Sequence, residues 1–274
     1  MTAAPSYALG HTDPEVERLQ VQARFLEKVT RRFIRECGIL PGMRVLDIGC
    51  GVGDVTLLLA DAVGASGAVI GIDRELKAVE IARVRADEAG YRQIEFAVDT
   101  DETIAKYSKF DAAIGRYVLV HQQDPTLMVT RAAAAVRPGG IVAFQEPYFH
   151  ASGSAAIPTL DLWRLVEESL EALTHVAFPS HEVAGRLAAC FEDAGLPTPE
   201  LIWETIVSGS PELHARYMAL VYRVFLPHIQ KLKLAQSDYI GDPATLYDRM
   251  LAAAKAARAQ VFSLPQVFAW STRV

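Results

Sequence analysis

The sequence predicts an α/β fold built on a doubly wound, mostly parallel, seven-stranded sheet, with an N-terminal helix and helical cap inserts. Short apolar segments alternate with amphipathic helical segments through the first half of the chain. This alternation is typical of a parallel sheet that helices cover on both faces. The first apolar segment also runs directly into a glycine-rich turn at residues 49–53, as a strand does where it ends at a ligand site.

The first element is a helix, because Asp13 suits the N-cap and Pro14 suits the first helical position. Apolar residues then recur every three or four positions as far as about Gly38. We expect seven strands, at residues 45–48, 69–73, 94–98, 110–115, 141–144, 200–207 and 264–270. Further helices are expected at residues 54–63, 75–90, 125–136, 158–174, 181–195, 210–236 and 242–261.

With 274 residues, the chain is long enough for one large domain or a domain with insertions. Three segments are expected. Residues 1–40 form an N-terminal helical segment, and residues 41–148 form the ligand-binding core. Residues 149–274 complete the sheet and carry two helical substrate-cap inserts, at about 151–178 and 210–261.

Composition narrows the class of protein. Apolar residues make up 51% and charged residues 22%, which is ordinary for a globular protein. The formal net charge of −6 argues against nucleic-acid and membrane partners. Three cysteines are too few for a disulfide framework or a zinc cluster, so a cytoplasmic protein is expected. Neither a membrane-spanning segment nor a secretory signal is recognisable.

The glycine-rich turn carries the main functional signal. Glycines are needed where a strand turns sharply into a helix and a ligand approaches the backbone. Asp73 ends the second strand 22 residues beyond Gly51, where a carboxylate can accept hydrogen bonds from ribose hydroxyls. Asp99 ends the third strand, in reach of the amine of adenine. Asp47 precedes the glycines and would repel a pyrophosphate, so a cationic nucleoside is favoured over a dinucleotide.

In this order along the chain, the motifs resemble the class I S-adenosylmethionine-dependent methyltransferases, which have a Rossmann-like fold. The resemblance covers roughly residues 38–148 and is greatest to the small-molecule enzymes of ubiquinone and menaquinone biosynthesis. The residues that carry it are Val45-Leu46-Asp47-Ile48-Gly49-Cys50-Gly51-Val52-Gly53, Gly71-Ile72-Asp73, Phe96-Ala97-Val98-Asp99, Phe110-Asp111-Ala112-Ala113-Ile114-Gly115-Arg116, Leu119-Val120-His121 and Val136-Arg137-Pro138-Gly139-Gly140.

The resemblance implies that S-adenosyl-L-methionine is the cofactor and that residues 41–148 bind it. Gly49 and Gly51 would contact its methionine part, with Asp47 near the ammonium group. Asp73 would hold the ribose. The other implied contacts are Asp99 and Thr100 to the adenine, Arg74 along the adenine or ribose, and the main chain near Arg116.

Methyl transfer from a sulfonium is a direct displacement, so most of the rate can come from positioning. His121 follows the fourth strand and Glu146 follows the fifth, so both are candidate catalytic residues facing the acceptor. Tyr7, Tyr148 and Trp163 are candidate substrate contacts outside the core. No cluster has the spacing of metal ligands, and no metal is expected.

Three questions stay open at this point. The acceptor is a small organic molecule, but O-, N- and C-methylation all suit this core. A non-methylating use of S-adenosylmethionine, such as cyclisation, would need the same glycine turn, and an NAD-dependent oxidoreductase is a weaker alternative. The helical inserts could also form a homodimer interface.

Overall fold

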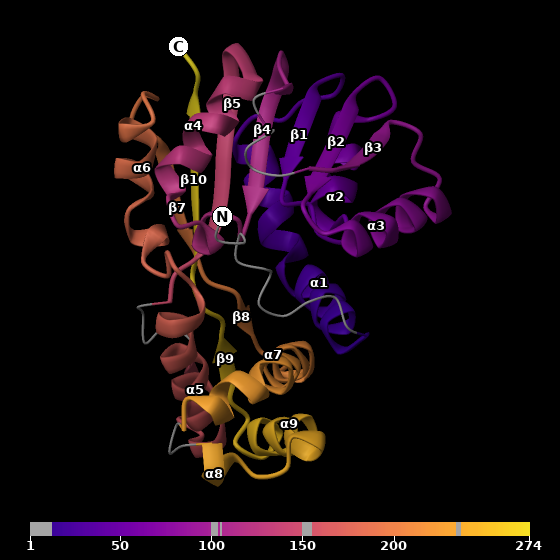
Figure 1. Ribbon diagram of the computed structural model, residues 1–274. Helices are drawn as coiled ribbons and strands as arrows, with labels where there is room; N and C mark the ends of the chain where they lie inside the picture. Colours follow the sequence, from indigo (N-terminus) through magenta and orange to yellow (C-terminus); the bar gives the residue numbers. More distant parts are fainter. Residues whose placement is uncertain (1–12, 100–103, 105, 150–154, 234–236) are drawn as a thin grey trace. The chain divides into compact units, whose positions relative to one another are not determined.

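The computed structural model describes residues 13–99, 104, 106–149, 155–233 and 237–274. The chain divides into two compact units, which are described separately here (Figure 1). The sheet unit comprises residues 27–148, 180–204 and 266–274. The helical unit comprises residues 1–26, 149–179 and 205–265, and these ranges contain both expected inserts.

The sheet unit contains the predicted seven-stranded sheet, in the order β3-β2-β1-β4-β5-β10-β7. The first five strands are parallel, whereas β10 is antiparallel to both of its neighbours. This confirms the predicted fold class. The strands are β1 (Arg44–Ile48), β2 (Ala68–Asp73), β3 (Ile94–Val98), β4 (Phe110–Arg116), β5 (Val136–Pro147), β7 (Glu200–Glu204) and β10 (Gln266–Thr272).

Helices of the sheet unit follow the predicted alternation. They are α2 (Asp54–Val63), α3 (Leu76–Glu88), α4 (Pro125–Ala135) and α6 (Leu187–Asp193), with short 3₁₀ turns η2 (Leu119–His121) and η3 (Val183–Gly185). Helix α1 (Asp13–Glu36) contributes its second half. The core between helices and sheet is apolar and fully buried at Phe33, Leu46, Leu59, Phe144 and Phe268.

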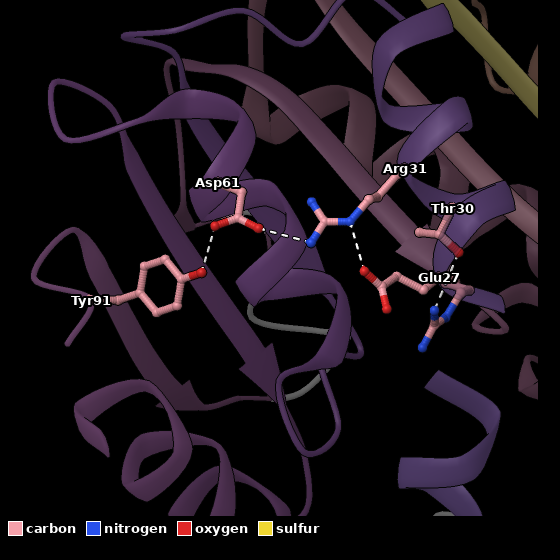
Figure 2. A network of polar contacts seen from close by, with 6 residues as sticks. Glu27, Thr30, Arg31, Asp61 and Tyr91 are labelled. Carbon is pink, nitrogen blue, oxygen red and sulfur yellow. Dashed lines mark hydrogen bonds and ion pairs between the residues drawn. The ribbon is translucent and has the colours of Figure 1, made fainter. Parts of the chain in front are cut away.

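A polar network joins α1 to α2 on the surface of this unit (Figure 2). Arg31 of α1 donates to Glu27 at 2.9 Å and to Asp61 of α2 at 3.0 Å. The Tyr91 hydroxyl donates to the same Asp61 at 2.5 Å. Single exposed ion pairs stabilise little, but Arg31 and Tyr91 both donate to the Asp61 carboxylate. The bond from Arg31 to Asp61 links α1 to α2.

The helical unit has a core of its own. Its helices are α5 (Asp161–Ala177), α7 (Glu212–Lys231), α8 (Ser237–Ile240) and α9 (Leu246–Ala256), with the turn η4 (Pro243–Thr245). Three short strands, β6 (Ala155–Ile157), β8 (Val207–Ser208) and β9 (Gln260–Phe262), form a second sheet in the order β6-β9-β8. Trp163, Tyr222 and Met250 are buried at the centre of this core.

Two predicted elements differ from the structure. The single strand expected at residues 200–207 is two strands, β7 and β8, which belong to different sheets. The helix expected at residues 242–261 ends at Ala256, and residues 260–262 form β9 instead. Strands of two or three residues are too short to give a recognisable alternation of apolar and polar side chains, so β6, β8 and β9 were not predicted.

His214 is an unusual group in the core of the helical unit. Its ring lies 4.9 Å from Phe25 and 5.4 Å from Trp163, measured between ring centroids, and is 1% exposed. Its Nδ1 atom has no hydrogen-bond partner among the described residues. Burial lowers the pKa of His214 from an ordinary 6.5 to about 3, so the folded protein keeps this ring neutral.

We expect His214→Leu to raise the free energy of unfolding by about 1 kcal/mol at pH 7.5, because the variant removes a buried polar atom without a partner. The gain should grow as pH falls from 6.5 towards 3, since the unfolded wild-type chain then takes up a proton that the folded chain refuses. Thermal unfolding of both proteins at pH 7.5 and 5.0 measures this. A variant that is less stable at both pH values would contradict the prediction.

Candidate functional site

The loop after β1 lies at the carboxyl edge of the parallel strands. Gly49, Gly51 and Gly53 all have positive φ angles, of 66°, 53° and 87°. A Cβ atom on Gly49 would lie 2.8 Å from Val118, and one on Gly53 would lie 3.1 Å from Ala82. A Cβ on Gly51 would meet no described atom within 4 Å. Two glycines are therefore required by packing, while Gly51 leaves its backbone open to a ligand.

Asp73 at the end of β2 supports this loop. Its Oδ2 atom accepts from the Gly51 amide at 2.9 Å, and its Oδ1 atom accepts from the Glu75 amide at 2.9 Å. Each carboxylate oxygen has two lone pairs, so each retains an acceptor site. The side chain is partly exposed. Asp73 is thus able to bind a further pair of hydroxyl donors while it holds the glycine loop.

Asp47 is a buried carboxylate beside the same loop. It accepts from the Thr56 hydroxyl of α2 at 2.5 Å and is 1% exposed. Burial is the main reason that the pKa of Asp47 is raised to about 7, and the neighbouring carboxylates Asp73 and Asp54 add to the rise. The hydrogen bond from Thr56 and the positive charge of Arg116 oppose it. A ligand that brings a positive charge would stabilise the ionised form of Asp47.

Asp99 follows β3 and is also buried. Its Oδ2 atom accepts from the Tyr107 hydroxyl at 2.8 Å and pairs with the Lys106 ammonium. Burial and the bond to Asp99 raise the pKa of Tyr107 to about 12, so the phenol stays protonated. Thr100 lies outside the described residues, and the Arg74 side chain is exposed.

Glu146 is fully buried near the end of β5. Its carboxylate accepts from the backbone amides of Val118, Leu119 and Val120 at 3.0, 2.8 and 3.3 Å. These three bonds hold Val118 and the first two residues of η2, which ends at His121. Glu146 therefore supports the loop that contains His121.

The candidate substrate residues are distributed between the two units. In the sheet unit, the Tyr148 ring packs against Trp203 of β7 with centroids 4.8 Å apart. In the helical unit, Trp163 is 1% exposed and donates to the Met250 carbonyl at 3.0 Å. Tyr7 lies outside the described residues.

Sequence reasoning missed the polar partners of these carboxylates. Thr56 and Tyr107 complete the surroundings of Asp47 and Asp99. Thr30, Gln145 and Gln266 form a buried polar set near the same edge of the sheet. Their separations along the chain follow no periodic pattern, so only the folded structure identifies them.

Two features are absent from the described residues, a cluster of metal ligands and a membrane-spanning helix. No group of three or more His, Cys, Asp or Glu side chains in these ranges is arranged to hold a metal ion. Within the same ranges, no helix has the length and apolar character to cross a membrane.

Comparison with known proteins decides the family. A family model described as a methyltransferase domain matches residues 39–190, more than half of the chain. The chain belongs to this methyltransferase family. Aklanonic acid methyltransferase DauC of Streptomyces sp. (strain C5) is 34% identical over 152 residues, which are 55% of this chain and 68% of that protein.

Two further matches agree with this assignment. The ubiquinone biosynthesis O-methyltransferase of Bordetella avium (strain 197N) is 32% identical over 189 residues, which are 67% of this chain and 76% of that protein. The crystal structure of the YcgJ protein from Bacillus subtilis has a TM-score of 0.61 at 19% identity, covering 90% of this chain and 98% of that one, and shows the shared fold.

The protein is therefore a class I S-adenosylmethionine-dependent methyltransferase of small molecules. The predicted resemblance, enzyme class and cofactor are confirmed. Methyl transfer is favoured over the non-methylating and NAD-dependent alternatives.

Burial raises the pKa of Glu146 from an ordinary 4.5 to about 8, even though three backbone donors oppose the shift. The folded protein then holds a proton that the unfolded chain releases, so the free energy of unfolding should fall as pH rises from 4.5 to 8. Glu146→Gln should reduce this slope, because the amide cannot ionise. Urea unfolding of both proteins between pH 5 and 9 measures the slopes, and equal slopes would contradict the prediction.

Proposed function

We propose that this enzyme O-methylates a hydroxyl or carboxyl group of a small organic acceptor. The name of one relative points to an organic acid and that of the other to O-methylation in quinone biosynthesis. One observation supports the place of the proposed cofactor site. The Gly51 backbone is open to a ligand, and Asp73 holds it at the carboxyl edge of the sheet. Ligands of open parallel sheets bind at this edge.

The residues around the loop fit S-adenosylmethionine in charge and hydrogen bonding. When bound, the cofactor supplies a methyl group on a sulfonium. Gly49 and Gly51 contact its methionine part, and Asp47 receives the ammonium group, which stabilises the buried carboxylate in its ionised form. Asp73 uses its two remaining acceptor sites for the ribose hydroxyls.

The adenine side of the proposed site is built around Asp99, with the backbone of Thr100. Tyr107 and Lys106 fix the Asp99 carboxylate through one oxygen, Oδ2. The Asp99 carboxylate is the proposed acceptor for the exocyclic amine of adenine. Arg74, whose side chain is exposed, lies along the adenine or ribose.

On the acceptor side, His121 is the proposed base and Glu146 positions it. S-adenosylmethionine, when bound, would supply its methyl group to the acceptor oxygen, with the electron pair of the broken carbon–sulfur bond left on sulfur, and the His121 imidazole would take up the proton that the acceptor loses. Glu146 holds the backbone before His121 through three amides and does not touch the acceptor. Tyr148 is the proposed acceptor contact from the sheet unit.

Location and assembly complete the proposal. All three cysteines are free and buried, which suits a reducing cytoplasm. The homodimer through the helical inserts stays a prediction.

We expect Gly51→Ala to weaken binding of S-adenosylhomocysteine by about tenfold or more, because the new methyl group occupies the space that the ligand needs. Gly90→Ala is the matched control, since Gly90 also has a positive φ (78°) and an open Cβ position. It lies between α3 and β3, before the amino end of β3 and so away from the carboxyl edge of the sheet. Isothermal titration measures affinity, and thermal unfolding shows whether both variants lose similar stability. Equal affinities of the two variants would contradict the role of the loop.

Activity is tested with methyl-labelled S-adenosylmethionine and a panel of phenols, hydroxyquinones and aromatic acids. Label should enter an oxygen-linked methyl group, with S-adenosylhomocysteine as the second product. His121→Gln should lower kcat by about 10²- to 10⁴-fold, the usual contribution of a general base, with cofactor affinity unchanged. Recovery of methylthioadenosine, or label on nitrogen or carbon alone, would overturn the proposed reaction.

A further inference from the structure

Arg116 is the last residue of β4, and its side chain lies on the same face of the sheet as that of Asp47. Asp47 pairs with Ile114 in the parallel ladder between β1 and β4. Paired residues of neighbouring strands point to the same face, and so do residues two apart on one strand. Arg116 is two residues beyond Ile114. Both side chains therefore lie on one face of adjacent strands at the carboxyl edge of the sheet, and the Arg116 charge opposes the rise that burial causes in the pKa of Asp47.

A neutral hydrogen-bond network holds the Arg116 guanidinium from one side. Its Nη1 atom donates to the Thr30 hydroxyl at 3.3 Å, and that hydroxyl donates to Gln145 Oε1 at 2.9 Å (Thr30 is labelled in Figure 2). Gln145 in turn donates to Gln266 Oε1 at 3.2 Å. Thr30, Gln145 and Gln266 are buried. The network orients the guanidinium but does not neutralise its charge.

The next residue, Tyr117, fixes the backbone beyond β4. Its φ angle is 59°, a left-handed conformation that is uncommon for a residue other than glycine. Its amide donates to the Gln145 carbonyl at 2.8 Å, and its hydroxyl donates to Gln266 Oε1 at 2.8 Å. Residues held in such conformations are concentrated at functional sites.

Among the described residues, Arg116 uses little of its hydrogen-bonding capacity. A guanidinium has five N–H donors, and Thr30 takes one of them. Among the residues that the structure describes, no carboxylate forms an ion pair with Arg116, although its side chain is partly buried. Arginine in this state is suited to a planar, bidentate anion such as a carboxylate.

The proposed cofactor presents such a group. Its methionine part carries an ammonium and a carboxylate on the same carbon. Asp47 and Asp73 suit the ammonium and the ribose, but both would repel the carboxylate. A cation beside Asp47 is needed to balance that repulsion, and Arg116 is placed to provide it.

We propose that the Arg116 guanidinium binds the α-carboxylate of S-adenosylmethionine, and that Thr30, Gln145 and Gln266 position it. This inference rests on the proposed cofactor site. It makes Arg116 a determinant of selectivity for ligands that carry the intact amino-acid group over ligands that have lost the carboxylate.

The test is a titration cycle with two ligands and two proteins. The ligands are S-adenosylhomocysteine and its decarboxylated analogue, which keeps the amine but has no carboxylate. Arg116→Met should weaken binding of S-adenosylhomocysteine by about 10- to 100-fold, the range expected for a charged hydrogen-bonded pair. The affinity of the same variant for the analogue should be unchanged or higher, because the cation that repels the amine has been removed. Arg116→Lys should restore part of the loss.

Arg31→Met is the matched control, because Arg31 is on α1 next to Thr30 but pairs with Glu27 and Asp61 on the surface. It should leave both affinities unchanged. Thermal unfolding establishes that each variant is folded. Equal weakening of both ligands by Arg116→Met, or weakening of neither, would overturn the proposal while leaving the cofactor site in place. Failure of the wild-type protein to bind S-adenosylhomocysteine would overturn both.

Discussion

The hydrogen bond from the Gly51 amide to the Asp73 carboxylate joins the loop after β1 to the end of β2, and the rest of the site depends on it. A strand that turns into a helix leaves amides without partners, and here one of them is satisfied by a side chain of the neighbouring strand. Each Asp73 oxygen accepts one backbone hydrogen bond with one of its two lone pairs, so the carboxylate can also accept hydrogen bonds from a ligand. Structural support and the proposed ligand recognition therefore share one carboxylate.

Several buried or partly buried ionisable groups lie at the carboxyl edge of the parallel strands, and the protein compensates their charges only in part. Asp47 and Glu146 lie in surroundings that disfavour their ionised forms. Arg116 has a neutral partner in Thr30 and no described carboxylate paired with it. Incomplete compensation has a cost in stability, because transfer of a charge out of water is unfavourable. A zwitterionic cofactor with a cationic sulfur is the kind of molecule that supplies the missing counter-charges.

The cofactor half of the molecule was largely predictable because its determinants are local. The strand, turn and helix around Gly51, and the strand that ends at Asp73, each follow from a short run of residues. The supports of the site were not predictable, since Gln145 and Gln266 come from distant strands that meet only in the folded sheet. The place of Glu146 after the fifth strand predicts a candidate catalytic residue. Its bonds to three backbone amides are visible only in the folded structure. The strands β6, β8 and β9 of the helical unit are too short to show an alternation of apolar and polar side chains, so the sequence does not predict them.

The position of β10 in the sheet has a consequence for the order of events during synthesis. This strand lies between β5 and β7, yet it follows both of them in the chain. While residues 266–272 are still inside the ribosome, β5 lacks its neighbour and β7 has no strand to pair with. Gln266 is also absent from the network around Tyr117 at that stage. A nascent chain can thus form the five parallel strands early, but the hydrogen-bond network beside the proposed cofactor site becomes complete only when the last strand of the sheet is inserted.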